Sequence, residues 1–107
     1  MFNLFLYPSE IPTSNFDKPI VVVRLHQKSL KEYQSIKFYD FAKNEIFTKV
    51  VLDINTIKLE NISSKDCYLS LNINKVAFLA TLKSRGIESH LYVDVITCVS
   101  LSSFLLT

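Results

Sequence analysis

Residues 35–53 read SIKFYDFAKNEIFTKVVLD, and this stretch decides the fold that the sequence predicts. Two runs rich in β-branched and aromatic residues flank a polar tip at residues 42–44, a pattern typical of a β-hairpin. With a three-residue loop, one face of the hairpin carries the apolar set Ile36, Phe38, Ile46, Thr48, Val50 and Leu52. The opposite face carries lysines and rings, namely Lys37, Tyr39, Phe41, Phe47 and Lys49.

The register of this hairpin decides how its side chains are used. In the three-residue loop, Tyr39 faces Phe47 and Lys37 faces Lys49. A two-residue loop would mix the two faces, because a one-residue shift turns every side chain to the other side of the sheet. We favour the three-residue loop because it places the aliphatic side chains together.

The composition indicates one globular domain over residues 1–107, with residues 1–19 as an N-terminal arm. The chain is 49% hydrophobic, which gives it enough apolar surface to offset the entropy lost on folding. Its single glycine excludes the glycine-rich loops that hold phosphates in P-loop and Rossmann proteins. The formal net charge of +2 permits nucleic-acid binding but does not require it.

The remaining chain is read mostly as strands. Residues 20–26 (IVVVRLH), 56–60, 66–73 and 90–98 are expected strands, and residues 53–55 are an expected turn. Residues 74–86 favour a helix, with Asn74 as N-cap and Gly86 at its end, although a hairpin turning at 83–86 is an alternative. We therefore expect a mainly β protein: a small antiparallel OB-like barrel or a sandwich, with one short helix near residues 75–85.

Catalytic and metal-binding patterns are absent from the sequence. Cys67 and Cys98 lack zinc-ligand spacing and are expected to be buried, so neither a metal nor a cofactor is predicted. An enzyme would need His26 or His90 beside Asp94 or a cysteine, and Asp94 is expected to face outward from its strand. We predict that the protein is not an enzyme.

The lysine and aromatic residues suggest a contact with single-stranded nucleic acid. Cations neutralise phosphates, and flat rings stack on bases whatever their sequence. The predicted contact residues are Arg24, Lys28, Lys37, Tyr39, Phe41, Phe47, Lys49 and Tyr68. In the alternative interpretation, Phe41 and Phe47 belong to the core, and the lysines only keep an edge strand soluble.

Scattered residues between positions 26 and 98 resemble the small OB-fold single-stranded-DNA-binding proteins of filamentous phages. The matching positions are Tyr39, Asn44, Glu45, Lys49, Asp53, Tyr68 and Asp94. The resemblance implies a five-stranded barrel, single-stranded DNA or RNA as the partner, and a homo-oligomer such as a homodimer. The chain departs from that family by lacking its turn glycines and by its longer segment 74–86.

A second hypothesis is a small protein-interaction module, such as a virus- or plasmid-encoded inhibitor of a host protein or a subunit of a larger assembly. It would use strand edges and the apolar ends of the chain. We expect no signal peptide, because the N-terminal apolar run lacks a basic segment. Asp94 interrupts the C-terminal apolar run and leaves fewer than the about 20 residues that cross a bilayer. The sequence thus predicts a cytoplasmic protein without membrane contact.

Overall fold

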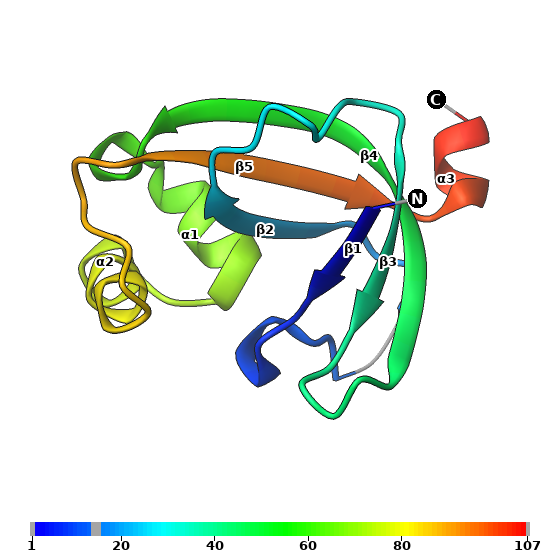
Figure 1. Cartoon of the computed structure of the whole chain (residues 1–107), viewed down its shortest axis with the longest axis horizontal. Coiled ribbons are helices and arrows are strands. Elements are labelled where there is room, and N and C mark those ends of the chain that lie inside the picture. Colours follow the sequence, from blue (N-terminus) through cyan, green and yellow to red (C-terminus); the bar gives the residue numbers. More distant parts are fainter. Residues whose placement is uncertain (1, 14–15, 107) are drawn as a thin grey trace.

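Within residues 2–13 and 16–106, which the computed structural model describes, five strands form one sheet curved into a half-barrel (Figure 1). The strands are β1 (Phe2–Phe5), β2 (Ile20–Leu25), β3 (Ser35–Tyr39), β4 (Glu45–Lys58) and β5 (Tyr92–Val99). The helices are α1 (Ser64–Leu71), α2 (Lys75–Ser84) and α3 (Leu101–Leu105), with short 3-10 turns at η1 (Pro8–Glu10) and η2 (Leu59–Asn61). The expected β-rich sheet is present, but the protein is mixed α/β, and the prediction of a single helix is wrong.

The sheet is mixed and open along one side. Its order is β1–β3–β4–β5–β2; β1 runs parallel to β3, whereas the other neighbours are antiparallel. The prediction of a fully antiparallel sheet is therefore wrong at β1. In the described part of the chain, β1 and β2 are the outer strands and do not pair with each other, so a closed OB-like barrel is not confirmed. We call the space between these two strands the seam.

The tip of the β3–β4 hairpin holds three residues, as expected, but they are residues 41–43 rather than 42–44. The Asp40 N–H donates to the Asn44 carbonyl at 3.0 Å, and the Asp40 carboxylate accepts from the Asn44 N–H at 2.9 Å. Lys43 closes the loop in the left-handed region, with φ of 68°. A left-handed residue at the end of a three-residue loop is the usual way to join two twisted strands.

A bulge next to this tip separates side chains that were predicted to share a face. Tyr39 pairs with Glu45, but the register then shifts, so that Phe38 pairs with Phe47. The one-residue shift reverses the orientation of everything beyond it in β4. Phe47 and Lys49 therefore turn toward the interior of the half-barrel, beside the fully buried Phe38. The predicted lysine–aromatic face is wrong as a single surface, because Lys37 and Tyr39 remain on the outside.

Strand β4 is much longer than expected. It continues through residues 53–58, where the sequence predicted a turn and a separate short strand. A second register shift lies between Val51 and Asp53, so Leu52 is the additional residue on β4 opposite β5. This bulge lets one strand bend along the half-barrel instead of breaking into two.

The segment predicted as a strand at 66–73 is helix α1. The Ser63 hydroxyl accepts from the Asp66 N–H at 3.1 Å and caps the helix, and Asn72 ends it with φ of 57°. Apolar residues at every second position suggested a strand, but the helix buries Cys67 and leaves Leu69 54% exposed. The cap signals were present in the sequence and outweigh the alternation.

Helix α2 confirms the prediction for residues 74–86. The Asn74 side chain accepts from the Ala77 N–H at 2.8 Å, and Gly86 adopts φ of 83° just beyond the helix. The alternative hairpin is wrong. The strands predicted at 20–26 and 90–98 correspond to β2 and β5.

Two cores lie on opposite faces of β2 and β5. The interior of the half-barrel packs residues from all five strands, with Leu6 and Leu30 from the connecting segments. The outer face of β2 and β5 packs against α1 and α2, which Figure 1 shows to one side of the sheet. Both predicted cysteine positions are confirmed as buried, Cys67 on the helix side and Cys98 inside the half-barrel. Among the described residues, no helix is long and apolar enough to cross a membrane.

Phe38→Ala should lower the free energy of unfolding by about 3–5 kcal/mol, because it removes a fully buried ring and leaves a cavity. Urea unfolding followed by circular dichroism measures the change. Phe41→Ala is the matched control; its ring is 58% exposed, so the loss should stay below about 1 kcal/mol. Equal losses in the two variants would contradict the register described above.

Candidate functional site

A single arginine spans the seam between the outer strands. Arg24 of β2 donates from Nη1 to Glu10 Oε2 (2.7 Å) and the Val23 carbonyl (3.0 Å), and from Nη2 to Glu10 Oε1 (2.8 Å) and the Phe5 carbonyl (2.7 Å). Glu10 Oε1 also accepts from the Tyr7 N–H at 2.8 Å. The Glu10 side chain is 2% exposed, so this bidentate pair neutralises a buried carboxylate. Arg24 thereby ties the end of β1 and η1 to the edge of β2.

A pocket of about 270 Å³ opens beside Arg24, and we call it the Tyr7 pocket. It lies where the hairpin tip, the end of β1 and the end of α2 approach the edge of β2. Its lining combines aromatic rings, two arginines and an aliphatic floor: Phe5, Tyr7, Val23, Arg24, Phe41, Leu82, Arg85 and Ile87.

The two arginines lie against the ring of Tyr7. The guanidinium carbon of Arg85 is 3.6 Å from the ring centroid, and that of Arg24 is 5.9 Å away. The Arg85 Nη2 also donates to the Ser9 hydroxyl at 3.2 Å. Cations at this distance are attracted by the electron-rich face of the ring. The contacts hold the positive charges at the pocket wall.

Four rings continue this surface onto the hairpin, and we call them the Tyr7 cluster: Phe5, Tyr7, Tyr39 and Phe41. Tyr7 and Phe41 meet edge to face with centroids 4.9 Å apart, and Phe5 and Tyr39 lie 6.0 Å apart. Phe5 is 47% exposed and Phe41 58% exposed. Aromatic area of this kind, left open to solvent beside arginines, is typical of a binding surface rather than of a core.

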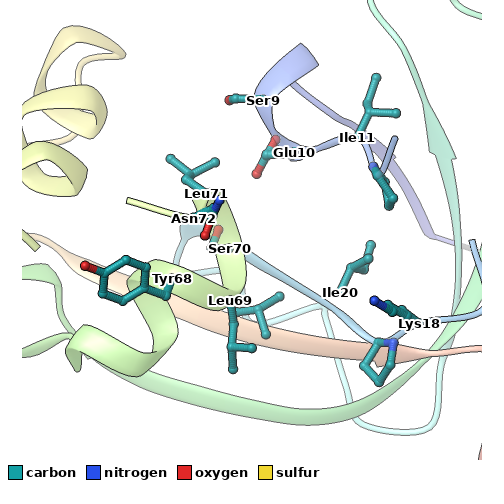
Figure 2. Close-up of a pocket in the computed structure, with 13 residues that line it drawn as sticks. Ser9, Glu10, Ile11, Lys18, Ile20, Tyr68, Leu69, Ser70, Leu71 and Asn72 are labelled. Atoms are coloured by element: carbon teal, nitrogen blue, oxygen red, sulfur yellow. The ribbon is translucent and has the colours of Figure 1, made fainter. Parts of the chain in front are cut away.

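A second hollow of about 210 Å³ lies along the seam on the other side of Glu10, between α1 and the segments on either side of residues 14–15 (Figure 2). Figure 2 shows Glu10 pointing from η1 toward the end of α1, with Ile20 and Lys18 on the far side. Tyr68, a predicted contact residue, borders this hollow, but its ring points away from Glu10 and Ile20 (Figure 2). The structure therefore separates Tyr68 from the hairpin rings that it was expected to extend.

Lys49 is buried rather than exposed on the hairpin. It is 2% exposed, and its Nζ donates to the carbonyls of Phe16 (2.5 Å) and Lys18 (3.2 Å). Burial lowers the pKa of Lys49, and the nearby acidic groups of Asp17 and Cys98 only partly oppose this effect. Its ammonium group binds the segment at residues 16–18, just before β2, and is not available to a phosphate in this arrangement.

The other predicted contact residues are dispersed. Phe47 packs edge to face on Phe38, with centroids 5.5 Å apart, and belongs to the half-barrel interior. Lys37 lies on the outer face of β3, where its Nζ is 3.5 Å from a Glu45 carboxylate oxygen. Lys28 is exposed in the segment after β2. Arg24, Tyr39 and Phe41 are the predicted residues that meet at the Tyr7 cluster and its pocket.

Sequence reasoning missed three residues of the Tyr7 pocket. Phe5 and Tyr7 lie in the N-terminal arm of residues 1–19, and Arg85 lies at the end of the predicted helix over residues 74–86; none of the three was among the predicted contact residues. The aromatic character of the first seven residues was a signal, but nothing in the sequence places them beside the hairpin.

A buried carboxylate lies near the end of β2. Asp94 is 1% exposed, so its predicted outward orientation is wrong. Its Oδ1 accepts from Thr56 Oγ1 (2.6 Å) and contacts His26 Nδ1 (2.8 Å), while its Oδ2 accepts from the Gln27 N–H (2.9 Å). The structure thus joins His26 to Asp94, one of the pairings that an enzyme was expected to need. His90 is exposed in the loop before β5.

These hydrogen bonds determine the ionisation of Asp94. Burial by itself would raise the pKa of the carboxyl group, but the donors from Thr56, Gln27 and His26 outweigh burial and lower the pKa below its ordinary value. The carboxylate is therefore charged at neutral pH, and it fastens the segment after β2 to β4 and β5.

No group of three or more His, Cys, Asp or Glu side chains suited to a metal ion occurs among residues 2–13 and 16–106. Comparison with known proteins found no matching family model, no matching curated protein and no matching solved structure. We therefore infer a function from the geometry of the seam.

Asp94→Asn should destabilise the protein by about 2 kcal/mol at pH 7, because an amide cannot accept all three hydrogen bonds. The folded pKa lies below the ordinary value of about 3.9, so the carboxylate contributes its stability above that pH and loses it as the pH falls through the folded pKa. Urea unfolding at several pH values should show the difference from wild type shrinking in acid. Asp53→Asn, an exposed control, should show no such convergence.

Proposed function

We propose that the protein binds single-stranded nucleic acid non-catalytically, and that the Tyr7 cluster with Arg24 and Arg85 is the contact surface. One observation carries the proposal: Arg85 lies on the Tyr7 ring at 3.6 Å, in a pocket whose walls include the exposed rings of Phe5 and Phe41. Rings and guanidinium planes are the groups on which unpaired bases stack.

The size of the Tyr7 pocket supports a small planar occupant. Sites for drug-sized molecules range from about 300 to 1,000 Å³, and this pocket is about 270 Å³. Its aliphatic floor of Val23, Leu82 and Ile87 favours an apolar surface, while the arginines favour acceptor groups at the edge. One base, with its phosphate directed toward the arginines, satisfies both requirements.

Further cations surround the pocket. Lys43 is exposed at the hairpin tip, two residues after Phe41, and Lys83 is exposed in the last turn of α2, two residues before Arg85. Contact with about three phosphates gives an expected slope of about −2 for the logarithm of the binding constant against the logarithm of salt. This modest slope agrees with the net charge of only +2.

The proposal keeps only part of the set predicted from sequence. It retains Arg24, Tyr39 and Phe41 at the centre, with Lys28 and Lys37 as peripheral charges. Phe47 and Lys49 are left out because they lie in the interior. A closed OB-like barrel is not required, since the contact surface lies on the seam of an open sheet.

Phe41→Ala should weaken binding of a fluorescein-labelled single-stranded oligonucleotide about tenfold, because one stacked base is worth about 1–3 kcal/mol. Arg85→Ala should weaken binding and reduce the salt slope by about 0.7, since one phosphate contact is lost. Fluorescence anisotropy at several salt concentrations measures both quantities.

The controls are an exposed tyrosine and an exposed lysine distant from the hairpin tip. Tyr33→Ala and Lys65→Ala should bind like wild type, because Tyr33 lies against Phe104 near α3 and Lys65 lies on α1. Circular dichroism confirms that each variant is folded. Absence of binding at low salt, or equal losses in control and test variants, would overturn the proposal.

The second predicted function, a protein-interaction module, has one observation in its favour. Leu101, Leu105 and Leu106 at α3 are 60%, 72% and 88% exposed. Exposed leucines grouped on one short helix are typical of a surface that contacts protein. A self-associating mass in sedimentation, together with no salt-dependent oligonucleotide binding, would favour this function over the first.

A further inference from the structure

Strand β5 begins at the end of the sheet where β4 and β2 end (Figure 1). Three residues lie side by side across these strand ends. Lys58 is the register partner of Tyr92, and the His26 N–H extends the pairing of β2 by donating to the Tyr92 carbonyl at 3.2 Å. Directly opposite residues share one face, with Cβ atoms about 4.5–5.5 Å apart. We call this set the Lys58–Tyr92–His26 row.

Asp94 fixes the imidazole at one end of this row. Because a carboxylate only accepts hydrogen bonds, the contact of 2.8 Å to Nδ1 requires that Nδ1 carry the hydrogen. In the neutral ring, Nε2 then holds a lone pair and accepts hydrogen bonds. The His26 side chain is 41% exposed, so its Nε2 is accessible to a ligand. The Asp94 carboxylate that orients the ring is buried, at 1% exposed.

The other two members of the row bring different chemistry. Tyr92 is 57% exposed, which leaves its ring open to stacking, although its neighbours along β5 are buried. Lys58 is partly exposed at the end of β4 and carries a positive charge. The row therefore combines a cation, a flat ring and an oriented acceptor within the span of three strands.

We propose that the Lys58–Tyr92–His26 row is a subsite for one ribonucleotide and makes the protein prefer RNA to DNA. Lys58 contacts a phosphate, the Tyr92 ring stacks on the base, and His26 Nε2 accepts the 2′-hydroxyl hydrogen that DNA lacks. This inference rests on the proposed function, because it assumes that a single strand is bound.

Strand β2 connects the row to the Tyr7 pocket. Arg24 lines that pocket and precedes His26 by two residues, a separation of about 7 Å along an extended chain. Both residues belong to the same face of β2, and Arg24 is the register partner of Asp94. The pocket floor at Val23 belongs to the opposite face of β2, so a strand with one nucleotide in the pocket would pass the edge of β2 beside Arg24 to place another nucleotide at the row.

The decisive experiment uses the wild-type protein and three labelled oligomers of equal length. Oligo-U, its 2′-deoxy form and its 2′-O-methyl form have the same base, and only the first has a 2′-hydroxyl to donate. Fluorescence anisotropy at constant salt should show oligo-U binding about three- to tenfold more tightly than either analogue, as expected for one added hydrogen bond.

His26→Ala should bring the affinity for oligo-U down to that for the 2′-deoxy oligomer. His90→Ala, which removes an exposed histidine outside the row, should retain the preference. If His26→Ala does not fold, the comparison of the three oligomers on wild type still tests the predicted preference for RNA. Tyr92→Leu should weaken binding of oligo-U and of the 2′-deoxy oligomer by the same factor, because stacking is independent of the sugar.

The outcomes separate this inference from the function on which it rests. Failure of wild type to bind all three oligomers would overturn the proposed function. Equal binding of all three would overturn the RNA preference alone. A full preference in folded His26→Ala would show that another group reads the 2′-hydroxyl and would overturn the assignment of the row.

Discussion

The contact between Arg24 and Glu10 is the interaction on which the arrangement of the seam depends. An open half-barrel leaves two outer strands with unpaired backbone groups. Arg24 donates hydrogen bonds to one carbonyl on each side of the seam, that of Phe5 in β1 and that of Val23 in β2. Glu10 holds the guanidinium in place and is itself buried. Removing one member would leave the other as an uncompensated charge, which is far more costly than the pair itself is beneficial. The Tyr7 pocket and the hollow beside α1 both take one wall from this contact.

The strongest local patterns along the chain led to correct predictions. Three consecutive valines in residues 20–26 form β2, and the caps Asn74 and Gly86 bound α2. The hairpin was located correctly, and its loop has the predicted number of residues. These features depend on preferences that act over a few neighbours, such as β-branching, side-chain capping and positive φ, so they can be read without knowledge of the rest of the fold.

What could not be predicted depends on contacts between distant residues. The bulge beside Tyr39 moves Lys49 from the expected surface into the interior, and no residue type in the sequence marks its position. The contact of His26 with Asp94 joins residues 68 positions apart. Tyr7 reaches the hairpin only because β1 adds to the sheet in parallel with β3. The candidate site was therefore predicted as a combination of cations and aromatic rings, but the prediction relied on lysines, and of its members only Arg24, Tyr39 and Phe41 belong to the Tyr7 cluster and its pocket.

The open seam has a further consequence for how the protein behaves at high concentration. An exposed strand edge is a template on which another chain can add, and this is a common route to edge-to-edge aggregation. β1 is only four residues long, and the edge of β2 is covered by the Arg24 side chain and by η1, which the Arg24–Glu10 pair holds there. The elements that shape the hollows thus also screen the sheet from neighbouring copies. An open half-barrel must block intermolecular sheet growth at its outer strands, and here the N-terminal segment both lines the hollows and covers the edge.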